Sequence, residues 1–220
     1  MKIDLHTHTS VSDGTLSPLE LVQGAELVGV DILSITDHDS VGAYAQLQNF
    51  NSRSMKLVHG IEFSCQWEKI GIHIVGLNIQ LGSDSIREGV KTQHHARLMR
   101  AQCIAEKLEK LGIENCWQGV KDVAGESVIG RPHFASMLVN NGVVKDFKQA
   151  FDRYLGPGKA GDVKHFWPTF DNIIQWIRDA NGTAVLAHPH KYKLTRSKLM
   201  ALLDDFREAG GEGMEVITGT

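Results

Sequence analysis

The sequence of 220 residues lacks several features that would assign it to a specialised class of protein. No apolar run approaches the roughly 20 residues of a membrane-spanning helix, so we expect no membrane partner. No signal-peptide pattern precedes the first predicted strand. The three cysteines, Cys65, Cys103 and Cys116, are odd in number and show no C-x-x-C spacing. They argue against a cysteine-based zinc site and favour a reducing compartment, which we expect to be the cytoplasm.

An excess of basic charge is also missing. The chain has 23 Lys and Arg residues against 26 Asp and Glu residues, which gives a formal net charge of −3. Duplex DNA is therefore not an expected partner, although a small basic pocket for one phosphate is compatible with this balance. No G-x-S-x-G motif is found, so nothing indicates a serine nucleophile. The 42% content of hydrophobic residues is that of an ordinary globular protein.

The eleven histidines are abundant, and the most informative ones lie in the first stretch, residues 1–14. Polar and apolar residues alternate over positions 2–6, which is typical of a short strand. Because His6 and His8 are two residues apart, a strand directs both imidazoles to the same face. With Asp13 in the Ser-Asp-Gly turn that follows, they can converge on a metal ion such as Zn, Mn or Fe.

The remaining pattern predicts an α/β fold with a helical insertion. Strands and helices alternate at first: strands over 31–36, 56–64 and 70–76, and helices from Pro18 to Val28 and over 41–50. Helical spacing then dominates over 86–112, 117–124, 132–141 and 146–154. A helix over 169–180, a strand over 183–188, a helix over 199–209 and a strand from Gly213 complete the chain. We therefore expect the first part of an α/β barrel in residues 1–80, an insertion in 81–165 and the second part of the barrel in 166–220.

Seven side chains of the types that can bind metals lie on or just after the predicted strands. They are His6, His8, Asp13, His38, Glu62, His73 and His188. Because the carboxyl ends of parallel barrel strands face one rim, all seven can meet there. Seven ligands exceed the three or four that one zinc ion needs, so we expect a cluster of two or three ions. Such clusters suit the hydrolysis of phosphate esters, in which the metal generates a hydroxide near neutral pH.

These residues stand in motifs that resemble those of the PHP (polymerase and histidinol phosphatase) phosphoesterases. The motifs are Asp4-Leu-His6-Thr-His8, Ser12-Asp13-Gly14, Ile35-Thr-Asp-His38-Asp39, Gly60-Ile-Glu62, His73 before Val-Gly, and Ala187-His188-Pro189. The resemblance implies a distorted, TIM-like barrel of seven β/α units and a trinuclear Mn, Fe or Zn centre, with Mn as the expected metal. It assigns the same seven residues both as metal ligands and as the catalytic set.

Within this family, the insertion with Gly130-Arg131-Pro132-His133 looks like that of bacterial enzymes that hydrolyse 3′,5′-nucleoside bisphosphates. The same group includes 5′→3′ exoribonucleases of the RNase AM type, which act on short RNA. On this resemblance we expect a nucleotide or short RNA as substrate. Arg131 would bind a second phosphate bidentately, and His133 would add a donor. The alternative for both is an ordinary surface arginine and a histidine at a helix start.

The sequence departs from the family pattern in one place, after His188. The family closes its site with a Gly-Ser-Asp-x-His type of motif on a late strand, and no Asp-x-His follows His188. We therefore expect the last barrel strands, and two ligands, to be missing from this chain. Two alternative functions stay open at this point: a phosphatase of the histidinol-phosphate type, and a non-catalytic metal-binding module.

Overall fold

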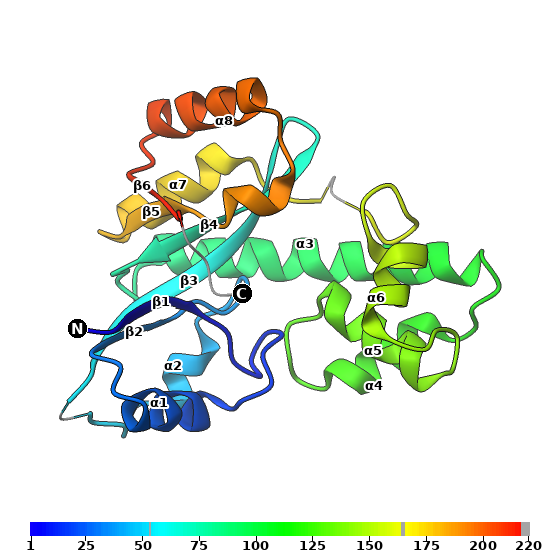
Figure 1. Cartoon of the computed structure of the whole chain (residues 1–220), viewed down its shortest axis with the longest axis horizontal. Coiled ribbons are helices and arrows are strands. Elements are labelled where there is room, and N and C mark those ends of the chain that lie inside the picture. Colours follow the sequence, from blue (N-terminus) through cyan, green and yellow to red (C-terminus); the bar gives the residue numbers. More distant parts are fainter. Residues whose placement is uncertain (53, 164–165, 217–220) are drawn as a thin grey trace. The chain divides into compact units, whose positions relative to one another are not determined.

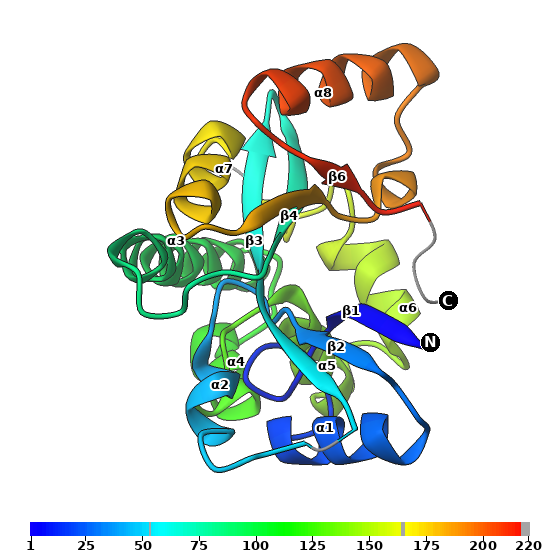
Figure 2. The ribbon, with the colours of Figure 1, turned by 90° about the vertical axis from the view of Figure 1, so that its left-hand side faces the viewer.

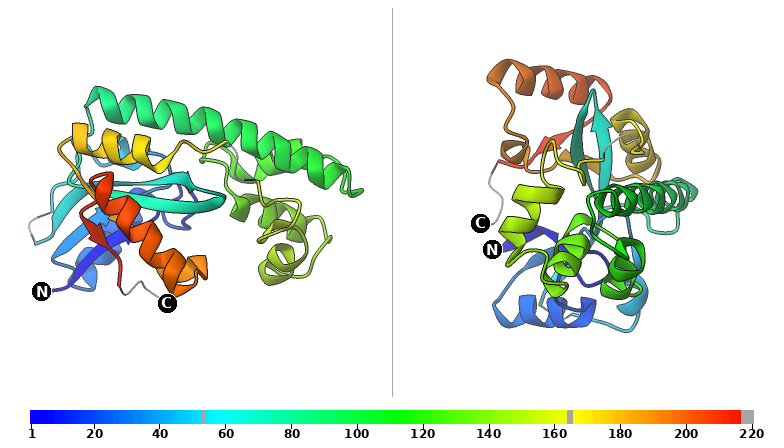
Figure 3. Two further views of the ribbon diagram at one scale, coloured as in Figure 1. Left: turned by 90° about the horizontal axis from the view of Figure 1, so that it is seen from above. Right: turned by 90° about the vertical axis from the view of Figure 1, so that its right-hand side faces the viewer.

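The computed structural model describes residues 1–52, 54–163 and 166–216. The chain divides into two compact units, one formed by Met1–Gln93 with Trp167–Thr220 and the other by His94–Phe166. Helix α3 (Asp84–Glu109) begins in the first unit and continues into the second as one long helix (Figure 3). Residues 53, 164, 165 and 217–220 of the predicted segments lie outside the described residues. No helix in the described part has the length and apolar character needed to cross a membrane.

The first unit is a mixed α/β fold built on one six-stranded sheet whose strands follow the order of the sequence (Figure 1). The strands are β1 (Ile3–Thr7), β2 (Ile32–Ile35), β3 (Lys56–Trp67), β4 (Ile70–Leu77), β5 (Thr183–Leu186) and β6 (Gly213–Met214). The sheet curls from β1 round to β6 as half of a barrel (Figure 2). The α/β class is thus as predicted, while a seven-stranded barrel and its closing strands stay a prediction.

One strand departs from the predicted parallel arrangement. The pairs β1–β2, β2–β3 and β5–β6 are parallel, but β4 runs antiparallel to both of its neighbours, β3 and β5. The reason lies in the connection, because only Glu68 and Lys69 separate β3 from β4. Two residues allow a hairpin, whereas a parallel crossover needs a dozen residues or more. The expectation that every ligand lies at the carboxyl end of a parallel strand is therefore wrong for β4.

Helices of the first unit cover this sheet. Helix α1 (Pro18–Leu27) begins where the sequence predicts it, with the Ser17 side chain accepting from the Glu20 amide in a capping box. Helix α2 (Gly42–Gln46) is shorter than the predicted segment 41–50. Helices α7 (Phe170–Asp179), η2 (Pro189–Tyr192) and α8 (Arg196–Glu208) follow later in the chain.

Two apolar clusters fill the first unit. One packs Phe63, Ile72, Ile174, Leu186 and Phe206 between β3, β4, β5 and the helices α7 and α8. The other packs residues of α1, α2 and β2, and includes Val22, Leu33 and Ile35. These clusters hold the strands that carry the candidate ligands.

The described part of the second unit contains helices and no strand. Its elements after α3 are α4 (Cys116–Ala124), α5 (Arg131–Asn140), α6 (Phe147–Ala150) and the π-helix η1 (Phe151–Leu155). A separate core of fully buried side chains holds them together and includes Ile104, Leu108, Val120, Phe134 and Leu138. The helical character that the sequence predicts for this region is confirmed.

Candidate metal centre

The turn after β1 fixes the first two imidazoles. His6 and His8 lie on one face of the strand, with their Nε2 atoms 3.1 Å apart. The amide of Gly14 donates to the Thr9 carbonyl oxygen, which folds the Ser-Asp-Gly turn back onto the strand. A Cβ atom at Gly14 would lie 2.4 Å from the carbonyl oxygen of His8, so only glycine permits this close approach.

Glu62 of β3 is the residue around which the other side chains gather, and it is fully buried. Three imidazole nitrogens surround its Oε2 atom. The Nε2 of His6 lies at 3.2 Å, the Nε2 of His8 at 3.1 Å and the Nδ1 of His38 at 3.1 Å. Three histidines from β1 and from the end of β2 therefore meet one carboxylate oxygen.

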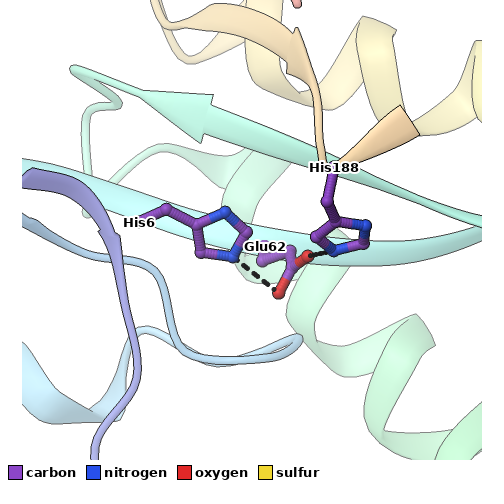
Figure 4. Close-up of side chains that lie close together, drawn as sticks. All are labelled: His6, Glu62 and His188. Carbon is purple, nitrogen blue, oxygen red and sulfur yellow. Dashed lines mark hydrogen bonds and ion pairs between the residues drawn. The ribbon is translucent and has the colours of Figure 1, made fainter. Parts of the chain in front are cut away.

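The second oxygen of Glu62 faces the other half of the sheet. Its Oε1 lies 2.9 Å from the Nδ1 of His73, which projects from the middle of the antiparallel strand β4. It also lies 2.9 Å from the Nε2 of His188, which follows β5. Figure 4 shows His6 and His188 approaching the carboxylate from opposite sides. Glu62 is thus shared by five imidazoles.

Asp13 completes the set that the sequence singles out. Its Oδ1 lies 3.4 Å from the Nδ1 of His8, and its Oδ2 lies 3.7 Å from the Nε2 of His38. The candidate ligand atoms form three overlapping groups: His6–Glu62–His188, His8–Asp13–His38 and His38–Glu62–His73. The structure brings all seven side chains together, and their role as metal ligands stays a prediction.

The donor atoms fit divalent cations. The Oε2 of Glu62 is buried, with three ring nitrogens around it at 3.1 to 3.2 Å. The Nε2 atoms of His6 and His8 face each other, and a hydrogen on one of them still leaves the lone pair of the other directed into the same space. Nitrogen and carboxylate oxygen together are a ligand set for Zn, Mn or Fe. Divalent cations bound among these atoms would accept the lone pairs of the ring nitrogens and of the Glu62 oxygen.

The electrostatics of the centre favour positive charge. Burial raises the pKa of Glu62, but the charges of His38 and His73 and hydrogen bonds from His188 and His6 outweigh it and hold that pKa well below its usual value. Burial lowers the pKa of His6, but hydrogen bonds and charges from Glu215 and Glu62 raise it to about 10. For His188, burial is the largest effect and lowers the pKa. The same carboxylates that stabilise an imidazolium at His6 would stabilise a bound cation.

Glu215 belongs to the centre and was missed by the sequence analysis. It follows β6, and its Oε1 lies 2.6 Å from the Nδ1 of His6. Its Oε2 accepts from the backbone amide of His188 at 2.6 Å. A carboxylate on Nδ1 directs the Nε2 lone pair of a histidine towards a metal. The available signal was an acidic residue on the strand predicted from Gly213, since the other candidate ligands also lie on or just after predicted strands.

Tyr192 joins β4 to the end of β5. Its hydroxyl accepts from the amide of His73 at 2.8 Å and donates to the carbonyl oxygen of Ala187 at 2.8 Å. His188, the residue after Ala187, adopts a left-handed conformation with φ of 31°. No sequence signal pointed to this tyrosine, because its partners are backbone groups of another strand.

Asp37 supports the opposite side of the centre. This carboxylate, buried beside His38, accepts from the Thr9 amide at 2.7 Å, from the Thr9 hydroxyl at 2.6 Å and from the Ser12 hydroxyl at 2.7 Å. The Ser12 oxygen in turn lies 3.4 Å from the Nδ1 of His8. Asp37 therefore fixes the turn that carries His8 and Asp13.

The predicted phosphate-binding residues lie in the second unit. Arg131 begins α5, and its Nη1 donates to the carbonyl oxygen of Leu155 at 3.2 Å. Burial lowers the pKa of Arg131, the charge of Asp162 opposes this, and the charge of Arg97 adds to it. The Nδ1 of His133 accepts from the Gly130 amide at 3.0 Å and caps α5. Their binding role stays a prediction.

The fold and this set of side chains define a hydrolase of the metal-dependent phosphoesterase class, and comparison with known proteins gives the same result. Residues 4–157 match the model of the PHP domain, so the chain belongs to the PHP-domain family. This is a family of metal-dependent phosphoesterases, and the chain is an enzyme of this class. The family implies divalent metal ions.

Individual relatives share nearly the whole chain. A 3′,5′-nucleoside bisphosphate phosphatase of Chromobacterium violaceum is 38% identical over 220 residues, which cover 99% of this chain and 77% of that protein. The 5′-3′ exoribonuclease Rnm of Escherichia coli is 41% identical over 216 residues, which cover 97% and 74%. A solved structure of an amidohydrolase from Chromobacterium violaceum, with bound sulfate and no metal, has a TM-score of 0.90 at 38% identity and covers 98% of this chain and 77% of its own.

Proposed function

We propose that this protein hydrolyses phosphate esters of nucleotides, with 3′,5′-nucleoside bisphosphates and the 5′ ends of short RNA as its substrates. The observation that carries the proposal is the gathering of five imidazoles on the two oxygens of buried Glu62. The names of the two relatives support the choice of substrate class.

The three overlapping groups of side chains would hold two or three divalent ions, and we propose Mn as the metal. When bound, such ions supply the Lewis acidity that lowers the pKa of water and neutralises phosphoryl oxygens. The protein itself orients the ligands. Glu215 holds the Nδ1 of His6 so that Nε2 faces the centre, and Tyr192 fixes the backbone at His73.

In this proposal a second phosphate binds to the N-terminal end of α5. The guanidinium of Arg131 presents a planar fork of donors that matches two phosphate oxygens. Because the Gly130 amide donates to the Nδ1 of His133, a neutral His133 carries its proton on Nε2 and can donate from there. An anion near the first turn of a helix is also favoured by the helix dipole.

Removal of the shared carboxylate tests the proposal. In Glu62→Ala and His6→Ala variants, we expect Mn-dependent release of phosphate from adenosine 3′,5′-bisphosphate to fall by at least about a hundredfold, because the cations lose their common ligands. His95→Ala, an exposed histidine of α3, is the matched control and should retain wild-type turnover. Near-wild-type turnover in either ligand variant would contradict the proposal. Histidinol phosphate in the same panel separates the alternative phosphatase activity.

A further inference from the structure

A run of basic side chains follows directly after His188. Within residues 191–198 the chain carries Lys191, Lys193, Arg196 and Lys198, all exposed, and no acidic residue occurs between Asp179 and Asp204. In a chain with a net charge of −3, this is a local excess of positive charge. We call Lys191, Lys193 and Arg196 the basic strip.

No described side chain neutralises the side chains of the basic strip. Within the described ranges none of the three forms a hydrogen bond or an ion pair, whereas Lys198 lies 3.4 Å from Glu68. Some other exposed cations, such as Lys148 with Asp152 at 2.6 Å, have acidic partners. Three unpaired cations in succession are therefore able to bind an external polyanion.

The backbone of the basic strip is anchored at the candidate metal centre. The amide of Lys191 donates to the carbonyl oxygen of His188 at 2.9 Å. Tyr192 and Leu194 pack against the core cluster of the first unit, so the alternating Lys191 and Lys193 face solvent. At a maximum of about 3.6 Å per residue, the Cα atoms of Lys191 and Lys193 lie within about 11 and about 18 Å of that of His188.

The position of the basic strip matters because the candidate metal centre itself is rich in negative charge. Glu62, Asp13 and Glu215 bring negative charge to the place where a phosphate must enter. Bound cations would offset this charge for the reacting phosphate only, because salt screens their field within about 8 Å. The later phosphates of an RNA chain need another source of positive charge.

We propose that the basic strip binds the phosphodiester backbone of a single-stranded RNA whose 5′ end lies at the metal centre. This inference rests on the proposed function and deepens it, because it names RNA, rather than a free bisphosphate, as the substrate for which the surface beside His188 is built. Helix α8 adds to the attraction: its N-terminal turn, capped by Thr195, carries partial positive charge next to Arg196.

The test compares two substrates in one enzyme. The double variant Lys191→Ala with Lys193→Ala, in the full chain with Mn, is assayed on a 5′-phosphorylated oligoadenylate and on adenosine 3′,5′-bisphosphate. We expect kcat/KM to fall about tenfold on the oligonucleotide and less than about twofold on the bisphosphate. The slope of log kcat/KM against log salt on the oligonucleotide should become shallower by about 1.4, since each phosphate contact to a single strand contributes about 0.7.

A matched control removes the same charge elsewhere. Lys107→Ala with Lys110→Ala, at exposed positions in the last turn of α3 and just after it, should leave the activity on both substrates unchanged. Equal losses on the two substrates, or equal effects of the two double variants, would overturn the inference.

Binding without turnover separates this inference from the proposed function. If the wild-type protein hydrolyses neither substrate, the proposed function fails, and the basic strip is tested by fluorescence anisotropy of a labelled oligoadenylate in EDTA. We expect the affinity to fall in the Lys191→Ala, Lys193→Ala variant and to persist in the control. An unchanged affinity would overturn the inference, and so would strip-dependent binding of phosphatidylserine vesicles without binding of RNA.

Discussion

The two halves of the candidate metal centre are held in place in different ways. In the N-terminal half, Asp37 fixes the turn of His8 and Asp13 through partners that lie 25 and 28 residues away in sequence. In the C-terminal half, Tyr192 reaches His73 across 119 residues, and Glu215 reaches His6 across 209 residues. Glu62 lies between the halves and contacts both. One half is therefore organised locally, and the other depends on the fold of the whole first unit.

The largest effect on stability should come from the support of the N-terminal half. Asp37→Ala leaves the Thr9 amide and the hydroxyls of Thr9 and Ser12 without their buried acceptor, which should cost about 3 kcal/mol of unfolding free energy. Urea unfolding in EDTA measures this loss without metal. The exposed Asp204→Ala should change the unfolding free energy by about 0.5 kcal/mol or less. Equal effects of the two substitutions would show that the local support is unimportant.

The remote carboxylate should act on metal affinity rather than on the fold. Glu215→Ala removes the acceptor that orients His6, and we expect Mn affinity to fall by about 10- to 100-fold. Glu215→Gln keeps an acceptor oxygen without the charge and should lose less. Isothermal titration with Mn distinguishes these outcomes. Wild-type affinity in Glu215→Ala would mean that His6 needs no support from the C-terminal half.

The smallest effect should come from Tyr192. Tyr192→Phe keeps the ring and removes the hydroxyl that links the His73 amide to the Ala187 carbonyl, which should cost about 1 to 2 kcal/mol in urea unfolding. Mn occupancy, measured by elemental analysis after gel filtration, should fall as well. The control is Tyr154→Phe, which removes a hydroxyl that accepts from Arg153 at an exposed contact, and both quantities should stay at the wild-type value. If Tyr192→Phe matches this control, the link between β4 and β5 has no role in the centre.

The difference between the locally organised half and the half that depends on the whole fold also determines what could be predicted from the sequence. His6, His8, His38 and His188 lie on or just after strands that periodicity reveals, so their convergence was predictable from a barrel-like arrangement, whereas the identity of a bound metal was not. The antiparallel course of β4 was readable in the gap between the predicted strands 56–64 and 70–76, which is too short for a parallel crossover, but the interpretation as a parallel barrel overlooked it. His73 nevertheless reaches Glu62, because the register of the β3–β4 hairpin brings the two strands together.

Other parts of the centre carry no local pattern. Asp37 stands next to a candidate ligand and could be suspected from its neighbour, but its partners Thr9 and Ser12 lie in another loop. Tyr192 acts through main-chain atoms of β4 and β5, which no arrangement of side-chain types encodes. Packing of distant segments determines these contacts, and it is visible only in the folded chain.

The bond between His6 and Glu215 also has a consequence for protein synthesis. A ribosome makes the first imidazoles almost at once, and it makes the acid that orients His6 only after 208 intervening residues. A nascent chain therefore contains His6 long before Glu215 is available to orient it. In the proposed metal centre, tight binding of cations would therefore require that translation has passed β6.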